Sequence, residues 1–385
     1  MFESLGLSEA ILKSIHQVGF QKPTPIQEKV IPIALQGKDI IGLAQTGSGK
    51  TAAFCIPLSE RLLHGSGLRG LILCPTREIA LQTKTFLDLF GKHHELDTVC
   101  IIGGVPLNPQ IRDLQKNPDI LVATPGRLAD HLERGNVKLD QICELVLDEA
   151  DHMLDLGFLP QIREILRQLP SERRTMMFSA TMPDSIESLA KQFMKNPERI
   201  DIIPEKKTAS GIEHRLYLVQ PEDKKKCLLS LIHHEPGSTL VFTQTKMDSD
   251  WLCRVLEDEK QDVARIHSDR TQKERTNALQ GFREGTHRIL VATAIASRGI
   301  DVPDIQHVIN FEIPDTVEEY IHRAGRTARA NALGTVSTIA TWTEVLRIRD
   351  FEKHLGFQLP RCETPGVEAY KEIQVKPFGR GNRRL

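Results

Sequence analysis

The chain lacks the features that mark several classes of protein. Only 5% of its 385 residues are aromatic, with 2 Trp and 3 Tyr, and no window approaches the apolar length of a membrane span. The N-terminus lacks a basic stretch followed by an apolar core, as a secretory leader would have. The net charge of -1 shows none of the bulk basicity typical of nucleic-acid-binding domains. These absences predict a soluble, cytoplasmic protein with no membrane partner, in which any polyanion site is local.

Cysteine pairs with C-x-x-C spacing are also absent. Several of the 7 cysteines lie in apolar stretches, and the full set is Cys55, Cys74, Cys100, Cys143, Cys227, Cys253 and Cys362. Scattered cysteines of this kind are more typical of buried thiols in a reducing compartment than of zinc sites or disulfides.

Apolar runs alternate with amphipathic segments along most of the chain. A length of 385 residues with 40% hydrophobic and 26% charged content favours two globular domains. The predicted strands are 40–43, 68–74, 99–102, 120–123, 145–147, 175–178, 216–219, 239–242, 263–266, 289–292 and 308–311. Helical patterns such as 247–256 separate them, which predicts an α/β fold with a mostly parallel sheet in each domain.

A polar stretch with turn-forming residues and no apolar periodicity divides the two sets of strands. We therefore predict an N-terminal domain at 1–203, a linker at 204–211, a C-terminal domain at 212–365 and a short basic tail at 366–385. The tail contains glycine and arginine, and both a nonspecific RNA tether and a loose end with incidental charge fit it.

A glycine-rich loop, A-Q-T-G-S-G-K-T at residues 44–51, follows the first apolar run and precedes a helical pattern. This strand, loop and helix order is typical of a phosphate cradle, although Ala44 stands where the general pattern has glycine. Backbone amides around the glycines face a pyrophosphate, the lysine reaches the outer phosphates and the threonine holds magnesium. The residues predicted to bind the nucleotide here are Thr46, Gly47, Ser48, Gly49, Lys50 and Thr51.

Two adjacent carboxylates, Asp148 and Glu149, close the apolar run at 145–147. Hydrolysis of a nucleotide requires one acidic group to organise magnesium and another to orient a water molecule, and these residues suit the two roles. Neighbouring residues of a strand point to opposite faces, so a shared site requires the strand to end before them. For Asp151 and Asp155, a solvated acidic helix start is the alternative. Together with the loop, the pair predicts an ATP site with Mg2+.

These residues resemble the DEAD-box ATP-dependent RNA helicase family of superfamily two, and the resemblance extends from Phe2 to about Gly356. Residues 19–27, G-F-Q-K-P-T-P-I-Q, resemble the adenine-reading motif of this family. The resemblance implies that Phe20 stacks on the base, with Phe2 as the upstream aromatic, and that Gln27 reads the adenine edge. It also implies two tandem RecA-like domains, ATP and magnesium as cofactors and RNA as partner. The basic tail resembles a shortened extension of bacterial RhlE-like members.

Further motifs in both halves resemble those that hold an RNA backbone in this family. Taken singly, each could be an ordinary strand-to-helix turn. The implied RNA-binding residues are Pro75, Thr76, Arg77, Gly103, Gly104, Thr124, Pro125, Gly126, Arg127, Gln272, Arg275, Thr293, Arg298 and Gly299.

The remaining motifs imply how the nucleotide and RNA sites communicate. By resemblance, Asp301 contacts the ribose, and Arg326 and Arg329 act as arginine fingers that belong to the catalytic set. The residues implied in coupling are Asp151, Ser179, Thr181 and His322. The alternative for the arginine cluster is a basic stripe facing RNA, which would include Arg323.

Three positions depart from the commonest pattern of the family: Ala294, Ser268 and Ala328. None removes a predicted phosphate, metal or ribose contact, but Ala294 stands where many members have aspartate, and this replacement would weaken a polar link between the RNA and ATP sites.

The resemblance implies a monomeric ATP-dependent RNA helicase, in which RNA-stimulated hydrolysis drives local unwinding of short duplexes or ribonucleoprotein remodelling. An ATP-gated RNA clamp whose partners control turnover is the main alternative. The adenine motif and the acidic motif disfavour a DNA translocase.

Overall fold

The computed structural model describes residues 1–44, 47–91, 96–202, 211–294, 305–328 and 333–364. The chain divides into two compact units, each built on one parallel sheet. The predicted linker lies almost entirely outside the described residues, and the predicted tail lies wholly outside them. Within the described ranges, no helix combines the length and the apolar composition needed to cross a bilayer.

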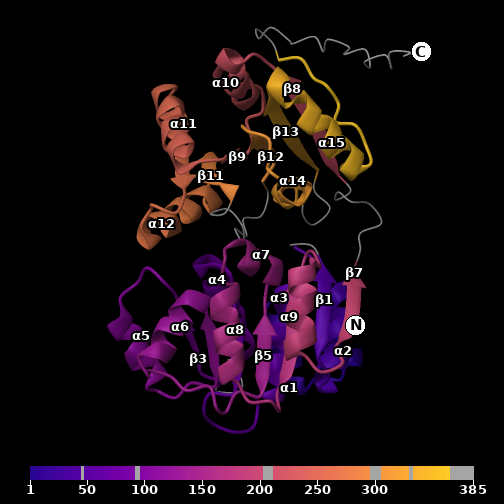
Figure 1. Ribbon diagram of the computed structural model, residues 1–385, viewed down its shortest axis with the longest axis vertical. Coiled ribbons are helices and arrows are strands. Elements are labelled where there is room, and N and C mark those ends of the chain that lie inside the picture. The colour runs from indigo at the N-terminus through magenta and orange to yellow at the C-terminus, as the bar shows by residue number, and fades with distance from the viewer. Residues whose placement is uncertain (45–46, 92–95, 203–210, 295–304, 329–332, 365–385) are drawn as a thin grey trace, which may run out of the picture. The chain divides into compact units, whose positions relative to one another are not determined.

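The first unit contains a seven-stranded sheet in the order β3-β4-β2-β5-β6-β1-β7, with parallel pairing throughout (Figure 1). Its strands are β1 Ile40–Ala44, β2 Gly70–Leu73, β3 Thr98–Ile101, β4 Ile120–Ala123, β5 Glu144–Leu147, β6 Arg174–Ser179 and β7 Glu198–Ile202. In β5, Leu145 and Leu147 belong to one apolar cluster and Val146 to another. The sheet is therefore buried on both faces, which explains its continuous apolar strands.

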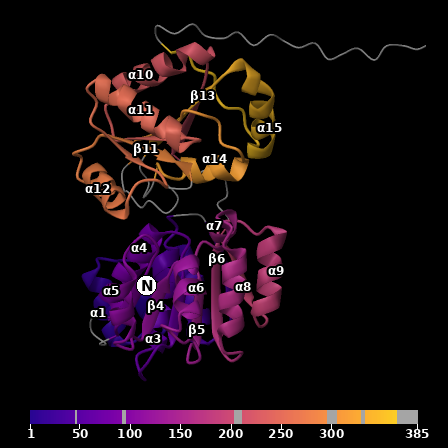
Figure 2. The ribbon, with the colours of Figure 1, turned by 60° about the vertical axis from the view of Figure 1, so that its left-hand side comes forward.

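Helices on each side of this sheet supply the two clusters (Figure 2). One cluster contains residues of α1 to α4 and the other contains residues of α6 to α9. The helices are η1 Phe2–Leu5, α1 Glu9–Gln17, α2 Pro25–Leu35, α3 Lys50–Arg61, α4 Arg77–Gly91, α5 Leu107–Leu114, α6 Pro125–Glu133, α7 Ala150–Asp155, α8 Leu159–Gln168 and α9 Asp184–Phe193.

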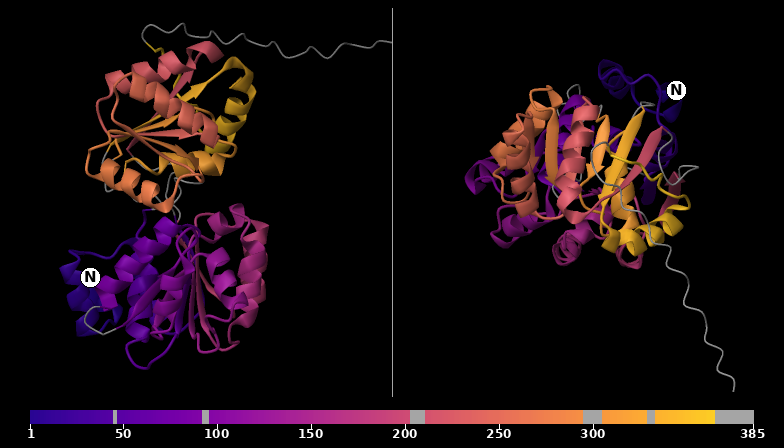
Figure 3. Two further views of the ribbon diagram at one scale, coloured as in Figure 1. Left: turned by 90° about the vertical axis from the view of Figure 1, so that its left-hand side faces the viewer. Right: turned by 90° about the horizontal axis from the view of Figure 1, so that it is seen from above.

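The second unit contains a six-stranded parallel sheet in the order β10-β11-β9-β12-β13-β8. Figure 3 shows this sheet with helices packed against it. Its strands are β8 Ile212–Leu218, β9 Thr239–Thr243, β10 Val263–Ile266, β11 Ile289–Thr293, β12 His307–Asn310 and β13 Gly334–Ala340. The helices are η2 Pro221–Asp223, α10 Lys224–His234, α11 Lys246–Asp258, α12 Gln272–Arg283, α14 Val317–Ala324, η3 Trp342–Glu344 and α15 Val345–Leu355. Threonine side chains cap two of them: Thr245 accepts from Asp248 N and Thr316 from Glu319 N, both at 3.1 Å.

The predicted α/β fold with parallel sheets is confirmed, but two strands were missed. β7 is an edge strand whose charged side chains are largely exposed, so it lacks an apolar run. β13 is buried although it contains serine and threonine. Ser337 Oγ is hydrogen-bonded to His307 Nε2 at 2.8 Å, and Thr338 Oγ1 accepts from Asn310 Nδ2 at 3.1 Å. Side-chain hydrogen bonds between neighbouring strands thus compensate for burying these polar groups. An apolar pattern in the sequence would instead predict such residues to lie on the surface.

All seven cysteines are free thiols, and Cys55, Cys74, Cys227 and Cys253 are buried, while the reducing compartment stays a prediction. Burial raises the pKa of Cys253 to about 12 and that of Cys227 to about 11.

Candidate functional site

The predicted nucleotide and RNA residues of the first unit gather at one edge of its sheet. In a parallel sheet all carboxyl ends lie on the same edge, and ligands bind where loops leave it. The predicted ATP residues of the loop and the acidic motif follow β1 and β5, and the predicted coupling motif follows β6. The predicted RNA residues follow β2, β3 and β4. In the strand order β3-β4-β2-β5-β6-β1, the two sets occupy adjacent halves of this edge.

The glycine-rich loop joins the end of β1 to the first residue of α3, Lys50. Gly47 and Gly49 have φ angles of 84° and 91°, the left-handed region that favours glycine. A Cβ atom on Gly49 would lie 2.6 Å from Gln27 Nε2, so a side chain there is excluded. Thr51 lies in the first turn of α3, whereas Thr46 lies outside the described residues.

Polar groups of this loop suit a phosphate ligand. The buried Lys50 Nζ donates to Ala44 O at 2.7 Å, and Ser48 Oγ is buried with no partner within the described parts of the chain. Backbone amides at a helix start, an ammonium group and an unsatisfied hydroxyl are the donors that a pyrophosphate accepts from. The loop therefore fits the predicted nucleotide.

Gln27 connects the predicted adenine motif to this loop. Thr24 caps α2, where Gln27 Oε1 accepts from the Thr24 backbone N at 3.0 Å in a capping box. Gln27 Nε2 donates to Gly49 O at 3.1 Å. The amide keeps one further donor and one further acceptor site for an adenine edge.

The aromatic ring predicted to stack on the base is partly exposed. Phe20 stacks on Phe2 with ring centroids 6.5 Å apart and 17° between planes, and its ring centroid lies 6.5 Å from that of Phe86. Phe2, the upstream aromatic, belongs to the apolar cluster and packs against the ring of Phe20.

The acidic pair lies directly after β5, which ends at Leu147. Glu149 has φ 47° and ψ 56°, a left-handed conformation that begins α7, so the prediction that the strand ends before the pair is confirmed. Asp148 is only 3% exposed. Burial first, and then the charge of Glu149, raise the pKa of Asp148 to about 7, while Lys50 opposes the shift.

Burying the charged form of Asp148 is unfavourable. A divalent cation beside it would offset this cost because the cation stabilises the charged carboxylate. Among the described residues, no group of three or more His, Cys, Asp or Glu side chains is placed to hold a metal. Mg2+ in nucleotide sites uses one or two carboxylates together with phosphate oxygens and water. Asp148 and the Thr51 hydroxyl therefore fit a magnesium ion that arrives with a nucleotide.

The Asp148→Asn variant is expected to be more stable than wild type at high pH when nucleotide and magnesium are absent. Because its pKa is raised, Asp148 binds its proton more tightly in the folded state than in the unfolded chain. Its contribution to folding stability is therefore full below the ordinary pKa of 3.8 and is lost as pH rises through about 7. At 1.36 kcal/mol per pKa unit, the advantage at pH 8 is at most roughly 4 kcal/mol, and it shrinks toward pH 5. Urea unfolding at both pH values checks this, and a variant less stable than wild type at pH 8 contradicts it.

Asp151 faces the coupling motif at the end of β6. Its Oδ2 accepts from Thr181 N at 2.9 Å, from Thr181 Oγ1 at 3.0 Å and from Ala180 N at 3.1 Å. Its backbone N donates to Ser179 Oγ at 3.3 Å. Asp151 is buried, so the alternative of a solvated helix start is wrong for it, whereas Asp155 is exposed.

The RNA residues predicted in the first unit lie close together. Gly103 and Gly104 follow β3 beside Arg77, because a Cβ atom on Gly104 would lie 2.0 Å from Arg77 Nη1. Thr76 Oγ1 accepts from Ile79 N at 3.3 Å at the start of α4. Arg127 Nη1 donates to Val105 O at 3.0 Å. The other members of this set are Pro75, which is buried before α4, and Thr124, Pro125 and Gly126, which begin α6.

In the second unit, the described candidates follow the carboxyl ends of several strands. Thr293 ends β11, Gln272 begins α12 and Arg275 lies one turn later. His322 and Arg326 follow β12 on and after α14, and the buried Arg326 Nε donates to His322 O at 3.3 Å. The candidates Arg298, Gly299, Asp301 and Arg329 lie outside the described residues.

Arg323 has a structural role that the sequence did not indicate. It is 3% exposed, its Nη2 donates to Glu319 Oε1 at 2.6 Å, and its Nη1 donates to Asn310 Oδ1 at 3.1 Å. Its guanidinium carbon also lies 4.8 Å from the centroid of the Phe242 ring. The alternative of an RNA-facing basic stripe is therefore wrong for Arg323, which fastens α14 to the sheet.

One departure from the family pattern has a structural consequence. Ala328 has φ 55°, a left-handed conformation that glycine adopts without strain and alanine does not. Ser268 is exposed and follows the buried His267, and Ala294 follows β11.

Sequence reasoning also missed His152, which lies on α7 three residues after Glu149. Its Nδ1 is 3.0 Å from Glu149 Oε2. The i, i+3 spacing of an acid and a histidine at a helix start was the signal for this contact.

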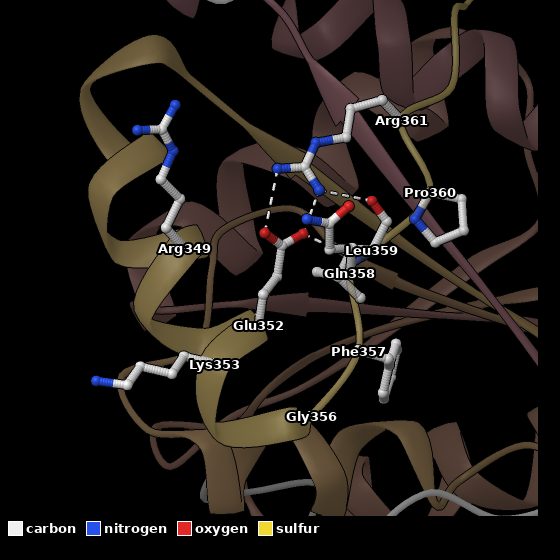
Figure 4. Close-up of a pocket in the computed structure, with 9 residues that line it drawn as sticks. All are labelled: Arg349, Glu352, Lys353, Gly356, Phe357, Gln358, Leu359, Pro360 and Arg361. Atoms are coloured by element: carbon white, nitrogen blue, oxygen red, sulfur yellow. Dashed lines mark hydrogen bonds and ion pairs between the residues drawn. The ribbon is translucent and has the colours of Figure 1, made fainter. Parts of the chain in front are cut away.

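A separate pocket of about 850 Å³ lies on the second unit (Figure 4). It is lined by Arg349, Glu352, Lys353, Gly356, Phe357, Gln358, Leu359, Pro360 and Arg361. Glu352 accepts from Leu359 N at 2.8 Å and pairs with Arg361, which fastens the segment after α15 to this helix. None of these nine residues belongs to the predicted ATP or RNA sets.

Comparisons with known proteins agree with this arrangement. A family model described as DEAD/DEAH box helicase matches residues 24–189, and one described as helicase conserved C-terminal domain matches residues 223–331. The DEAD-box ATP-dependent RNA helicase RhpA of Helicobacter pylori is 39% identical over 375 residues, 97% of this chain and 76% of that protein. The DEAD-box ATP-dependent RNA helicase CshA of Geobacillus kaustophilus is 41% identical over 378 residues, 97% of this chain and 81% of that protein.

Solved structures give the same result. S. cerevisiae Dbp5 bound to RNA and ADP BeF3 has a TM-score of 0.85 at 30% identity, covering 94% of this chain and 96% of that one. Mss116p bound to ssRNA and AMP-PNP has a TM-score of 0.85 at 27% identity, covering 97% and 79%. The two sheets are thus two tandem RecA-like domains, while the RhlE-like branch stays a prediction. Since relatives at about 40% identity align over nearly its whole length, the chain belongs to the family of DEAD-box ATP-dependent RNA helicases.

Proposed function

We propose that this protein is an RNA-stimulated ATPase that separates short RNA duplexes or remodels ribonucleoproteins. The observation that carries the proposal is the continuous edge of the first sheet, where the nucleotide set and the RNA set follow adjacent strands. The bonds from Asp151 to Thr181 lie at the same edge, at the ends of β5 and β6. The RNA and nucleotide analogue bound to Dbp5 support the same pair of ligands.

The chemistry proposed for the first unit follows from the placement of its side chains. The loop from Gly47 to Thr51 holds the phosphates, and Lys50 neutralises charge on the outer ones. Glu149 orients a water molecule toward the terminal phosphate. Bound magnesium, held by Asp148 and Thr51, would neutralise charge on the phosphate oxygens. Phe20 and Gln27 select adenine over other bases.

The proposed contribution of the second unit is to complete catalysis when RNA is bound. Asp301 contacts the ribose, and Arg326 and Arg329 stabilise charge on the transferred phosphoryl group. RNA contacts go mainly to phosphates and 2′-hydroxyl groups, which gives little sequence preference and a choice of RNA over DNA. Coupling runs through Asp151, Ser179, Thr181 and His322.

The proposal also includes the wider organisation of the protein. We assign the N-terminal RecA-like domain to 1–203, the linker to 204–211, the C-terminal domain to 212–365 and the tail to 366–385. A monomer in the cytoplasm is the working form. Burial raises the pKa of the Cys55 and Cys74 thiols well above the ordinary value. Such free thiols support a reducing compartment.

A strand-displacement assay distinguishes this function from that of an ATP-gated clamp. With a short RNA duplex and excess protein, ATP is expected to release the labelled strand, whereas no nucleotide gives no release. A clamp would retain the RNA with ATP and release no strand, which would overturn the helicase assignment.

A further inference from the structure

A buried histidine contacts the carboxylate that we place in catalysis. His152 lies on α7 at the carboxyl end of the sheet (Figure 1), and its ring is 3% exposed. The ring atom Nδ1 lies 3.0 Å from Oε2 of Glu149, whose side chain is 14% exposed. The opposite ring nitrogen, Nε2, is buried with no partner among the described residues. The contact to Glu149 is thus the polar interaction that orients this imidazole.

The chemistry of the pair defines the tautomer. The proposed role of Glu149 requires an ionised carboxylate, which only accepts hydrogen bonds, so in that state Nδ1 of His152 carries the hydrogen and donates it. A bond to a charged acceptor is among the stronger hydrogen bonds, and burial strengthens it further. Glu149 has a flexible side chain, and this bond favours the orientation in which Oε2 faces His152.

His152 is also linked to the coupling residues through its backbone. Its backbone N donates to Asp151 Oδ1 at 3.0 Å, while Asp151 Oδ2 accepts from Thr181 N and Oγ1. The ring on one side and the backbone on the other thus connect Glu149 to the network at the end of β6.

We propose that His152 is a positioning residue for Glu149, and that its Nδ1–H bond aims the carboxylate that orients the attacking water. This inference rests on the proposed role of Glu149. It predicts a loss in the chemical step, because misplacing a catalytic group by about 1 Å costs about 100-fold in rate. Nucleotide and RNA affinity should not change, since within the described residues the ring Nδ1 and the backbone N of His152 contact Glu149 and Asp151, which belong to neither binding set.

Two substitutions separate the hydrogen bond from the packing of the ring. His152→Asn keeps an N–H donor at the position of Nδ1, and His152→Leu fills the buried space without a donor. We expect His152→Leu to lower RNA-stimulated kcat by about 10- to 100-fold, with KM for ATP and the affinity for a non-hydrolysable analogue unchanged. His152→Asn should recover most of the lost rate. If the leucine variant unfolds, His152→Met serves as the donor-free variant, and Tm is measured for each protein.

The outcomes are decisive when Glu149→Gln is measured in parallel. If the asparagine and donor-free variants have equal kcat, whether both high or both low, His152 acts by packing or not at all and the inference is overturned. If Glu149→Gln itself retains full turnover, the proposed function of Glu149 fails, and this result is distinct from a failure confined to His152.

Discussion

Replacing Glu149 with glutamine is expected to lower RNA-stimulated ATP hydrolysis by about 10²- to 10⁴-fold, the usual contribution of a positioned acid or base. Glutamine keeps the size of the side chain but cannot accept a proton from water. It can still pair with His152 through its carbonyl oxygen, so the turn at 148–151 should remain intact. Binding of ATP and of RNA is expected to persist.

The matched control is Asp155→Asn, which neutralises an exposed carboxylate at the end of α7, the helix that follows Glu149. Steady-state turnover with saturating RNA is measured for both variants, and analogue binding is measured separately. Ordinary turnover in the Glu149→Gln protein, or an equal loss in the Asp155→Asn protein, contradicts the role given to Glu149.

Replacing Arg326 with alanine is expected to abolish most of the RNA-stimulated rate. Arginine fingers contribute about 10³- to 10⁵-fold in phosphoryl transfer because they stabilise charge that develops in the transition state. Lysine lacks the planar fork of donors, so Arg326→Lys should restore little of the rate. The first unit should still bind ATP with unchanged affinity. A measured affinity therefore distinguishes a loss of catalytic rate from a loss of ATP binding.

Arg326 is buried, so its folding contribution is measured alongside turnover. Arg254→Ala removes an exposed arginine of α11 in the same unit and serves as the control for loss of charge. If the Arg326→Ala protein keeps full turnover with RNA, Arg326 does not belong to the catalytic set. The same conclusion follows if the variant loses its cooperative melting transition together with its activity, because the loss is then one of folding.

Patterns of neighbouring residues predicted many of the strands and the place of the acidic pair, because these features depend on interactions that are local in the sequence. The runs at 40–43, 120–123 and 145–147 became β1, β4 and β5, since strands buried on both faces need continuous apolar sequence. The end of β5 before Asp148 followed from the alternation of side chains along a strand. The family motifs then led to the candidate residues at the carboxyl edge.

Contacts between distant segments could not be predicted in this way. The Asp39 carboxylate accepts from Thr175 N at 2.7 Å and from Lys195 N at 2.6 Å, residues more than 130 positions away. Gln27 Nε2 donates to the backbone O of Gly49, 22 positions away. These bonds depend on which backbone groups remain unsatisfied once the sheet has formed, and no periodicity in the sequence encodes that.

The most direct test of the central claim is steady-state ATP hydrolysis with magnesium in four conditions: no nucleic acid, single-stranded RNA, duplex RNA with an overhang, and matched DNA. If nucleotide and RNA residues on one sheet edge work as a coupled site, both RNAs stimulate turnover strongly and DNA does not. Equal rates in all four conditions would contradict coupling, and stimulation by DNA alone would contradict the choice of RNA.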